Sequence, residues 1–236
     1  MYGWRAKIGL ITPMSENVEH AFHIYAPEGV SFASTKISYP AENIEVLTER
    51  VGQAAAMYQD YDVDLVVFGC TSGQNVLDFA QEQACAREIE RVSGHPCLSA
   101  GQAVLDALQA LGAKKVAVMT PYSEAVNEEE KKFLENSGYE VTAMLGMDVS
   151  YVLNPGNSLE SCDEYLLYRN ALKLELNGAD ALYLDCLGLT TLELVNDLET
   201  VLGVPVVTAQ QAALWGALRR SRVGAKPEKL GKLFSL

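Results

Sequence analysis

The sequence predicts an α/β protein built from two similar halves, each a parallel β-sheet flanked by helices. Three observations support this prediction: an internal repeat, short uninterrupted apolar runs, and helical patterns between those runs. The chain has 236 residues, and 49% of them are hydrophobic. A chain of that size can bury one large core or two smaller ones, so it is expected to be globular.

The internal repeat matches three segments of the first half with three of the second, in the same order. The shifts between the copies differ by only a few residues, as short loop insertions would cause. Two copies are too few for a solenoid, so they indicate two pseudo-equivalent α/β halves. The paired segments are "AKIGLITP" (6–13) with "KKVAVMTP" (114–121), "DLVVFGCTS" (64–72) with "DALYLDCLG" (180–188), and "GHPCLSAGQAVLDAL" (94–108) with "GVPVVTAQQAALWGAL" (203–218).

The individual elements follow from local patterns. Apolar runs such as Ile8–Ile11 and Leu65–Phe68 are short, continuous and bounded by turn signals, as buried parallel strands are. Residues 45–61 and 128–138 have helical patterns; acidic residues open the second of these, and Gly138 closes it. Strands that alternate with helices predict Rossmann-like halves, whose ligands bind beyond the carboxyl ends of the strands.

The repeat also predicts a domain division. We expect the first half to span residues 1–112 and the second half to span residues 113–208. The C-terminal helix, about residues 209–236, is expected to join the first half. The active site would then lie in the cleft between the halves. The basic segment 219–236 is expected to be solvated or packed on a neighbouring element.

Charge and composition narrow the range of partners. The net charge of −13 disfavours nucleic acid and anionic membranes. The start of the chain lacks the features of a signal peptide, and no apolar run has the length of a membrane span, so we expect a cytoplasmic protein.

The sequence lacks the common motifs for nucleotide phosphates and metal ions. The phosphate-binding patterns GxGxxG and GxxxxGK[ST] are missing. His20 and His23 have no further Cys or His pair to complete a metal site.

Two of the five cysteines have equivalent places in the repeat. Cys70 and Cys186 each follow the central strand of their half. If the halves face each other across a pseudo-twofold axis, the two thiols face each other too. Cys85 and Cys162 lie in helical patterns and Cys97 lies in an apolar strand, so these three are expected to be buried hydrophobes. The same reading, a small buried hydrophobe, is the alternative for Cys70 and Cys186.

Four motifs together resemble a known family: "GCTS" (69–72), "TPY" (120–122), "LDCLGLTT" (184–191) and "GVPVVTAQQAALWGALR" (203–219). Over nearly the whole chain the sequence resembles the aspartate/glutamate racemase superfamily, within the branch of maleate cis–trans isomerases and arylmalonate decarboxylases. This resemblance implies an enzyme that acts on a small carboxylate with no cofactor and no metal. Homo-oligomers are common among such enzymes.

The resemblance also implies roles for individual residues. Cys70 matches the first cysteine of the family, a nucleophile or base, and Cys186 matches the second, an acid or base on the opposite face. The residues expected to hold the substrate carboxylate are Asn17, Thr71, Ser72, Tyr122, Leu187 and Gly188. Simpler readings remain open, because Thr71 and Ser72 could cap a helix, Tyr122 could be a core aromatic and Asn17 could be a turn former.

Departures from the family pattern leave three reactions open. The decarboxylases have glycine at the position of Cys70, which favours an isomerase or racemase. The isomerases have Thr-Asn where this chain has Leu187-Gly188, which favours a malonate-type decarboxylase with Cys186 as the proton donor. A carboxylate-binding protein without catalysis is a further alternative.

The sequence suggests how the two thiols could be activated. A helix around residues 73–83 would begin just after Cys70, and a second helix would follow Cys186. The positive end of each helix dipole would then stabilise a thiolate and lower the pKa of each cysteine.

Overall fold

Two four-stranded parallel sheets form the framework of the protein. The computed structural model describes residues 3–13, 17–38, 41–70, 78–147, 162–224, 227 and 229–236. The first sheet has the order β2-β1-β3-β4 and the second has the order β6-β5-β7-β8. The strands of the first sheet are β1 (Ala6–Pro13), β2 (Val30–Ile37), β3 (Leu65–Phe68) and β4 (Cys97–Ser99). The strands of the second sheet are β5 (Lys115–Thr120), β6 (Glu140–Gly146), β7 (Ala181–Leu184) and β8 (Val206–Thr208).

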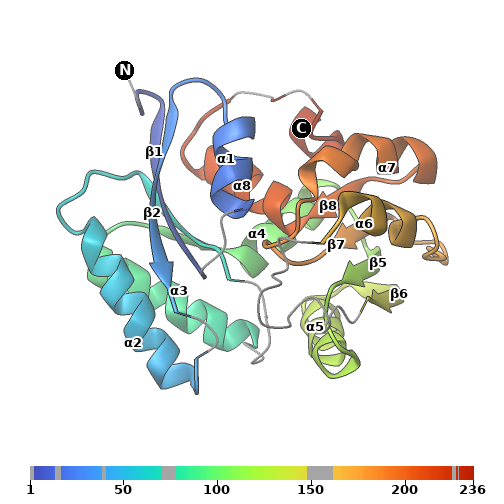
Figure 1. The fold of residues 1–236 in the computed structure, drawn as a ribbon, viewed down its shortest axis with the longest axis horizontal. Helices are drawn as coiled ribbons and strands as arrows, with labels where there is room; N and C mark the ends of the chain where they lie inside the picture. The colour runs from blue at the N-terminus through green and yellow to red at the C-terminus, as the bar shows by residue number, and fades with distance from the viewer. Residues whose placement is uncertain are drawn as a thin grey trace.

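Helices cover both sheets. Figure 1 shows α2 and α3 outside the first sheet, with α4 and α8 in the centre of the molecule between the two halves. The α-helices are α1 (Asn17–Tyr25), α2 (Ile44–Ala55), α3 (Phe79–Ser93), α4 (Ala100–Ala110), α5 (Glu124–Asn136), α6 (Glu164–Ala171), α7 (Val195–Leu202) and α8 (Ala209–Arg220). Short 3₁₀-helices are η1 (Ala56–Tyr58), η4 (Leu192–Leu194) and η5 (Lys232–Ser235). The predicted α/β fold with two parallel sheets is therefore confirmed.

The repeat seen in the sequence recurs in the hydrogen bonding. Asp64 and Asp180 precede the central strands β3 and β7, and each carboxylate accepts the backbone N–H at the start of the neighbouring strand, from Lys7 at 2.8 Å and from Lys115 at 2.9 Å. These paired carboxylates fix the register of β1 with β3 and of β5 with β7. The two halves thus use the same residue type for the same structural purpose.

Three apolar clusters form the core. One lies between the first sheet and α2 and α3, another lies between the second sheet and α6 and α7, and the largest joins the two halves. Helix α8 belongs to this joining cluster and packs against α4, α1, β3 and β4. An added Cβ at Gly216 of α8 would lie 2.9 Å from Leu98 Cδ2, so glycine permits the close approach. The exact domain boundaries stay a prediction.

The C-terminal segment is packed rather than solvated. Leu230, Leu233 and Phe234 are buried in the joining cluster. The side-chain amide of Gln211 donates to the carbonyl of Leu230 at 2.7 Å. The basic residues of this segment therefore lie on a stretch that is anchored by its apolar side chains.

The structure tests only one of the two predicted helix starts. Helix α3 begins at Phe79, where Asp78 and Gln81 form a capping box, and the predicted start just after Cys70 lies outside the described residues. After Cys186, the first helical residues are those of η4, and α7 begins only at Val195. Cys162 also lies outside a helix, since α6 begins at Glu164. The predicted helix start directly after Cys186 is therefore wrong, because several non-helical residues separate Cys186 from η4.

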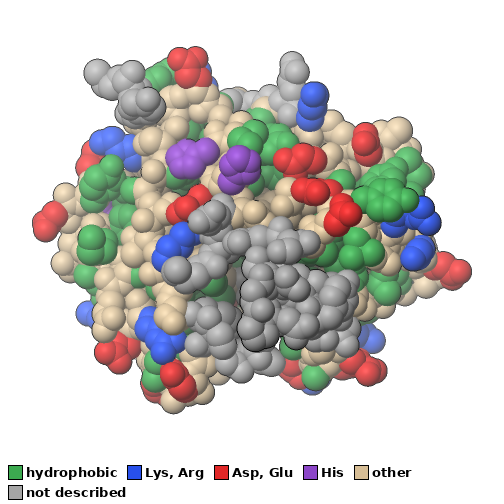
Figure 2. All heavy atoms as spheres, in the orientation of Figure 1, with side chains coloured by type: hydrophobic (Ala, Val, Ile, Leu, Met, Phe, Trp, Pro, Cys, Tyr) green, Lys and Arg blue, Asp and Glu red, His purple; other side chains and the backbone are tan. Residues whose placement is uncertain are grey.

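Three features of the described residues concern charge, membrane-spanning helices and metal ligands. Lys and Arg side chains are dispersed over the face shown in Figure 2 and do not gather into one basic patch. Within the described part of the chain, no helix combines the length and the apolar character needed to cross a membrane. The same residues include no group of three or more His, Cys, Asp or Glu side chains placed to hold a metal ion.

Candidate active site

Both strand-end cysteines are buried. Cys70 lies just beyond β3 and is 3% exposed, and Cys186 lies just beyond β7 and is 6% exposed. β3 and β7 are the inner strands that pair with β1 and β5. None of the five cysteines, all of which the structure describes, forms a disulfide.

The loops that carry the two cysteines pack against each other. A Cβ added at Gly69 would lie 2.9 Å from Thr12 Cγ2 and 3.2 Å from Leu187 Cδ2. Leu187 directly follows Cys186, so the loop after β7 contacts the end of β3. Only glycine at position 69 leaves room for this approach. The structure thus brings Cys70 and Cys186 to one junction between the halves, and that their thiols face each other stays a prediction.

The loop after β7 is held from three sides. Asn17, at the start of α1, donates its side-chain amide to the carbonyl of Gly188 at 2.9 Å. Gln210 of α8 donates to the carbonyl of Leu187 at 2.8 Å. The hydroxyl of Tyr25 donates to Glu193 at 2.9 Å. Asn17, Leu187 and Gly188, all predicted site residues, are therefore brought together, and in this arrangement the Asn17 amide supports the loop.

Cys186 has an unusual backbone conformation. Its φ of 93° lies in the left-handed region that non-glycine residues rarely adopt. Such a conformation costs about 1–3 kcal/mol and persists only where the surroundings impose it. Here the Asp185 carboxylate accepts the N–H of Cys186 at 2.6 Å and the hydroxyl of Tyr183 at 2.6 Å. These bonds fix the direction in which the Cys186 thiol points.

The surroundings of Cys186 keep its thiol protonated. Burial and the neighbouring Asp185 carboxylate raise the pKa of Cys186 to about 12, although hydrogen bonds from the Gly188 N–H, the Tyr122 hydroxyl and the Leu189 N–H oppose the shift. At neutral pH this side chain is a proton donor, and the expectation of a lowered pKa is wrong for Cys186. Burial is the largest cause of this shift.

Tyr122 is placed as predicted at the carboxyl end of β5. It is 8% exposed, its N–H donates to Thr120 Oγ1 at 3.0 Å, and its carbonyl accepts from the side-chain amide of Asn127 at 3.3 Å. Its side chain interacts with both the Cys186 thiol and the Asp185 carboxyl. Thr71 and Ser72 lie outside the described residues, so their roles stay predictions.

The remaining cysteines belong to the apolar clusters of the two halves. Cys85 belongs to α3, Cys97 to β4, and Cys162 precedes α6. Burial raises the pKa of each of these thiols. They therefore behave as small apolar side chains.

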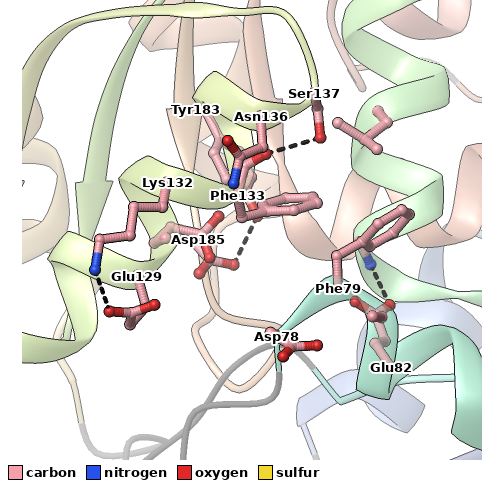
Figure 3. A pocket seen from close by; sticks show the side chains of 14 residues that line it. Asp78, Phe79, Glu82, Glu129, Lys132, Phe133, Asn136, Ser137, Tyr183 and Asp185 are labelled. Atoms are coloured by element: carbon pink, nitrogen blue, oxygen red, sulfur yellow. Dashed lines mark hydrogen bonds and ion pairs between the residues drawn. The ribbon is translucent and has the colours of Figure 1, made fainter.

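Sequence reasoning missed two buried carboxyl groups, Asp185 and Glu82. Both line a cavity of about 640 Å³ between α3, α4, α5 and the end of β7 (Figure 3). Burial raises the pKa of Glu82 to about 7, against hydrogen bonds from Ser99 and from the Gly101 N–H at 2.7 Å. A carboxylate directly after four buried apolar residues, as in "ALYLDC", is the signal that could have revealed Asp185.

Comparison with known proteins identifies the family. A family model described as arylmalonate decarboxylase matches residues 8–234. Arylmalonate decarboxylase of Bordetella bronchiseptica is 28% identical over 233 residues, which cover 96% of this chain and 95% of that protein. Maleate isomerase of Geobacillus stearothermophilus is 22% identical over 200 residues, which cover 82% of this chain and 78% of that protein.

A solved structure agrees with this result. The crystal structure of arylmalonate decarboxylase superimposes with a TM-score of 0.84 at 27% identity, and the match covers 97% of this chain and 99% of the other. The similarity therefore extends over both sheets and the junction between them. The chain belongs to the arylmalonate decarboxylase and maleate isomerase family, within the aspartate/glutamate racemase superfamily.

Proposed function

We propose that the protein is a cofactor-independent isomerase or racemase of a small carboxylate that uses Cys70 and Cys186. The observation that carries this proposal is the presence of a cysteine beyond the inner strand of each sheet, on two loops that pack together through Gly69 and Leu187. One thiol alone would suffice for proton donation, whereas two thiols allow chemistry at two positions of the substrate.

The two cysteines have different tasks in this proposal. Cys186, with its raised pKa, is the acid, so Cys70 acts as the thiolate. In cis–trans isomerisation, the Cys70 thiolate adds to one carbon of an activated double bond and Cys186 gives its proton to the other. The new single bond rotates. Cys186 then removes a proton as the carbon–sulfur bond breaks, and the double bond returns in its other geometry.

Racemisation uses the same arrangement. The Cys70 thiolate removes the proton from the carbon next to a carboxylate, and Cys186 gives a proton to the opposite face. Both reactions increase negative charge on a substrate carboxylate, which donors positioned in advance stabilise. We assign this task to the hydroxyls of Thr71, Ser72 and Tyr122.

A malonate-type decarboxylase is the second candidate. Two observations favour it: the Leu187-Gly188 pair after the second cysteine, and a Cys186 thiol that stays protonated at neutral pH. In this reaction a carbon–carbon bond breaks, CO2 leaves, and Cys186 protonates the enediolate. Cys70 would have no necessary part.

Proton NMR of the protein with maleate in D2O is the first test. Catalytic formation of fumarate is expected for the isomerase, together with complete loss of turnover in Cys70→Ala and in Cys186→Ala. Cys85→Ala, which removes a buried thiol from α3, is the matched control and should keep full activity. Racemase substrates and disubstituted malonates follow in the same assay.

The Cys70 variant separates the candidates. Full turnover in folded Cys70→Ala would contradict the two-cysteine proposal. If that variant releases CO2 from a disubstituted malonate at the unmodified rate, the decarboxylase replaces the isomerase as the proposed function.

A further inference from the structure

The cavity beside the active site ends at an unsatisfied carboxylate oxygen. Asp185 is fully buried, and its Oδ2 atom has no hydrogen-bond partner within the described part of the chain. The carboxyl lines the inner wall of the cavity, and Figure 3 shows it opposite Glu82 of α3. A buried carboxyl oxygen without a partner is costly unless the group is protonated or meets a ligand or water.

The cavity can hold water and reaches the surface. Its volume of about 640 Å³ is far above the roughly 30 Å³ that one water molecule takes up in the liquid. Exposed residues form its rim, among them Asp78, Lys132 and Asn136. The aromatic rings of Phe79 and Phe133, with centroids 5.2 Å apart, form part of the wall. The cavity therefore brings solvent close to the buried Asp185 carboxyl.

On its other side Asp185 is linked to Cys186. Its Oδ1 atom accepts the N–H of Cys186, and the side chain of Tyr122 interacts with both the Asp185 carboxyl and the Cys186 thiol. The chain of groups thus runs from the cavity through Asp185 and Tyr122 to the sulfur atom.

We propose that Asp185 is a positioning residue that supplies Cys186 with its proton, taken from solvent in the cavity and passed on through Tyr122. The proposal rests on the proposed function only in assigning Cys186 the role of acid. It explains why a carboxyl group lies buried beside a thiol that must begin each cycle protonated.

The proton transfers balance as follows. In racemisation or decarboxylation, where Cys186 does not recover a proton from the substrate, the S–H bond breaks as Cys186 gives its proton to substrate carbon, and a thiolate remains. The thiolate takes the hydroxyl proton of Tyr122, while the Tyr122 oxygen takes the proton of the Asp185 carboxylic acid. The Asp185 carboxylate then takes a proton from hydronium or a buffer acid in the cavity, which restores Asp185, Tyr122 and Cys186. In racemisation the Cys70 thiol also gives the proton that it took from the substrate to water or a buffer base.

Several titratable groups surround Asp185 and contribute to its state. Tyr183 lies on its own strand, Tyr122 follows β5, Glu82 faces it from α3, and Glu130 belongs to α5. Burial raises the pKa of the Asp185 carboxyl, which favours the protonated form that the transfer requires. Across the cavity, burial and the charge of Asp185 raise the pKa of Glu82.

Alkylation of Cys186 by iodoacetamide tests the proposal without any substrate. The rate at Cys186 is followed by peptide mass spectrometry as a function of pH in the intact protein. Asp185→Asn keeps an oxygen that accepts from Cys186 and Tyr183, but it removes the carboxyl proton and charge. We expect its alkylation profile to move to lower pH, with a rate at pH 8 about tenfold or more above that of the unmodified protein.

Control variants make the result specific. Asp197→Asn removes the same charge from an exposed position of α7 and should leave the profile unchanged. Asp185→Ser is the second variant if Asp185→Asn does not fold. Tyr122→Phe combined with Asp185→Asn should give non-additive effects, because both residues act in one chain.

The outcomes separate this proposal from the proposed function. An unchanged alkylation profile in folded Asp185→Asn would overturn the role of Asp185, whatever the substrate is. Additive effects of the Tyr122 and Asp185 variants would overturn the path through Tyr122. A shifted profile together with no turnover of any carboxylate would leave Asp185 in its role and reject the isomerase or racemase.

Discussion

The loops that follow β3 and β7 occupy equivalent positions in the two halves, yet the residue before each cysteine differs. Gly69 precedes Cys70, and its lack of a side chain lets Leu187 and Thr12 approach. Asp185 precedes Cys186, and its carboxylate fixes the backbone of the cysteine and raises its pKa. The repeat therefore places two thiols alike, while one neighbouring residue in each loop decides whether the loop is tightly packed or acidic.

Making the first loop resemble the second should have the largest effect. Gly69→Asp would press a buried carboxylate against the methyl groups of Thr12 and Leu187. We expect a loss of more than about 3 kcal/mol in the free energy of unfolding, and about 1–3 kcal/mol for Gly69→Ala, measured by urea denaturation. Gly224→Ala, at a glycine with open space around it, should be neutral. Equal stability of Gly69→Ala and Gly224→Ala would disprove the close packing of the two loops.

The acidic surroundings of the second loop predict a pH-dependent stability. The pKa of Glu82 rises from 4.5 to about 7 through burial, so the folded protein holds this proton more tightly than the unfolded chain. The stabilisation that comes from protonated Glu82 is therefore fully present below pH 4.5 and is lost as the pH rises through about 7. Relative to Glu82→Gln, the unmodified protein should lose about 3 kcal/mol across that range.

Urea denaturation at several pH values measures this difference. Glu128→Gln, at an exposed position of α5, should follow the unmodified protein at every pH. Parallel pH profiles for Glu82→Gln and the unmodified protein would show that the Glu82 carboxyl has an ordinary pKa.

The backbone conformations of the two cysteines predict opposite preferences for glycine. At Cys186, with positive φ, Cys186→Gly should be about 1 kcal/mol more stable than Cys186→Ala. Cys70 does not have positive φ, so Cys70→Ala should be more stable than Cys70→Gly by about 0.5–1 kcal/mol. Thermal unfolding of the four variants gives the comparison, and the same sign at both positions would contradict it.

The smallest expected effect concerns the support of the second loop. Asn17→Ala removes the amide that donates to Gly188, which should reduce the stability by about 1 kcal/mol. Tyr25→Phe removes a more exposed hydrogen bond to Glu193 and should have a smaller effect. Urea denaturation measures both variants. A larger loss of stability for Tyr25→Phe than for Asn17→Ala would show that the Tyr25 contact supports the loop more than the Asn17 contact does.

Much of the fold could be predicted from the sequence because the signals are local and repeated. Short apolar runs marked the buried strands, and Gly138 marked the end of a helix, where the structure gives it a φ of 91°. The same reasoning placed Cys70, Cys186 and Tyr122 at strand ends, since parallel strands carry their ligand sites there.

The helix starts and the electrostatics were harder to predict. The start of α3 at Phe79 depends on the capping box of Asp78 and Gln81. The pKa of Cys186 depends on its burial and on the position of Asp185, neither of which a linear pattern contains. The contact between Leu187 and Gly69 joins residues far apart in the chain, so only the folded structure shows it.

The packing of α8 against the first sheet determines when the apolar faces there are covered during synthesis. Residues 209–220 pack against α1, β3 and β4, which leave the ribosome much earlier. Until α8 emerges, the apolar faces of these elements remain uncovered, and a nascent chain in that state is prone to aggregation. A ribosome stalled before α8 should therefore carry a protease-sensitive first half, although all of its strands have been made.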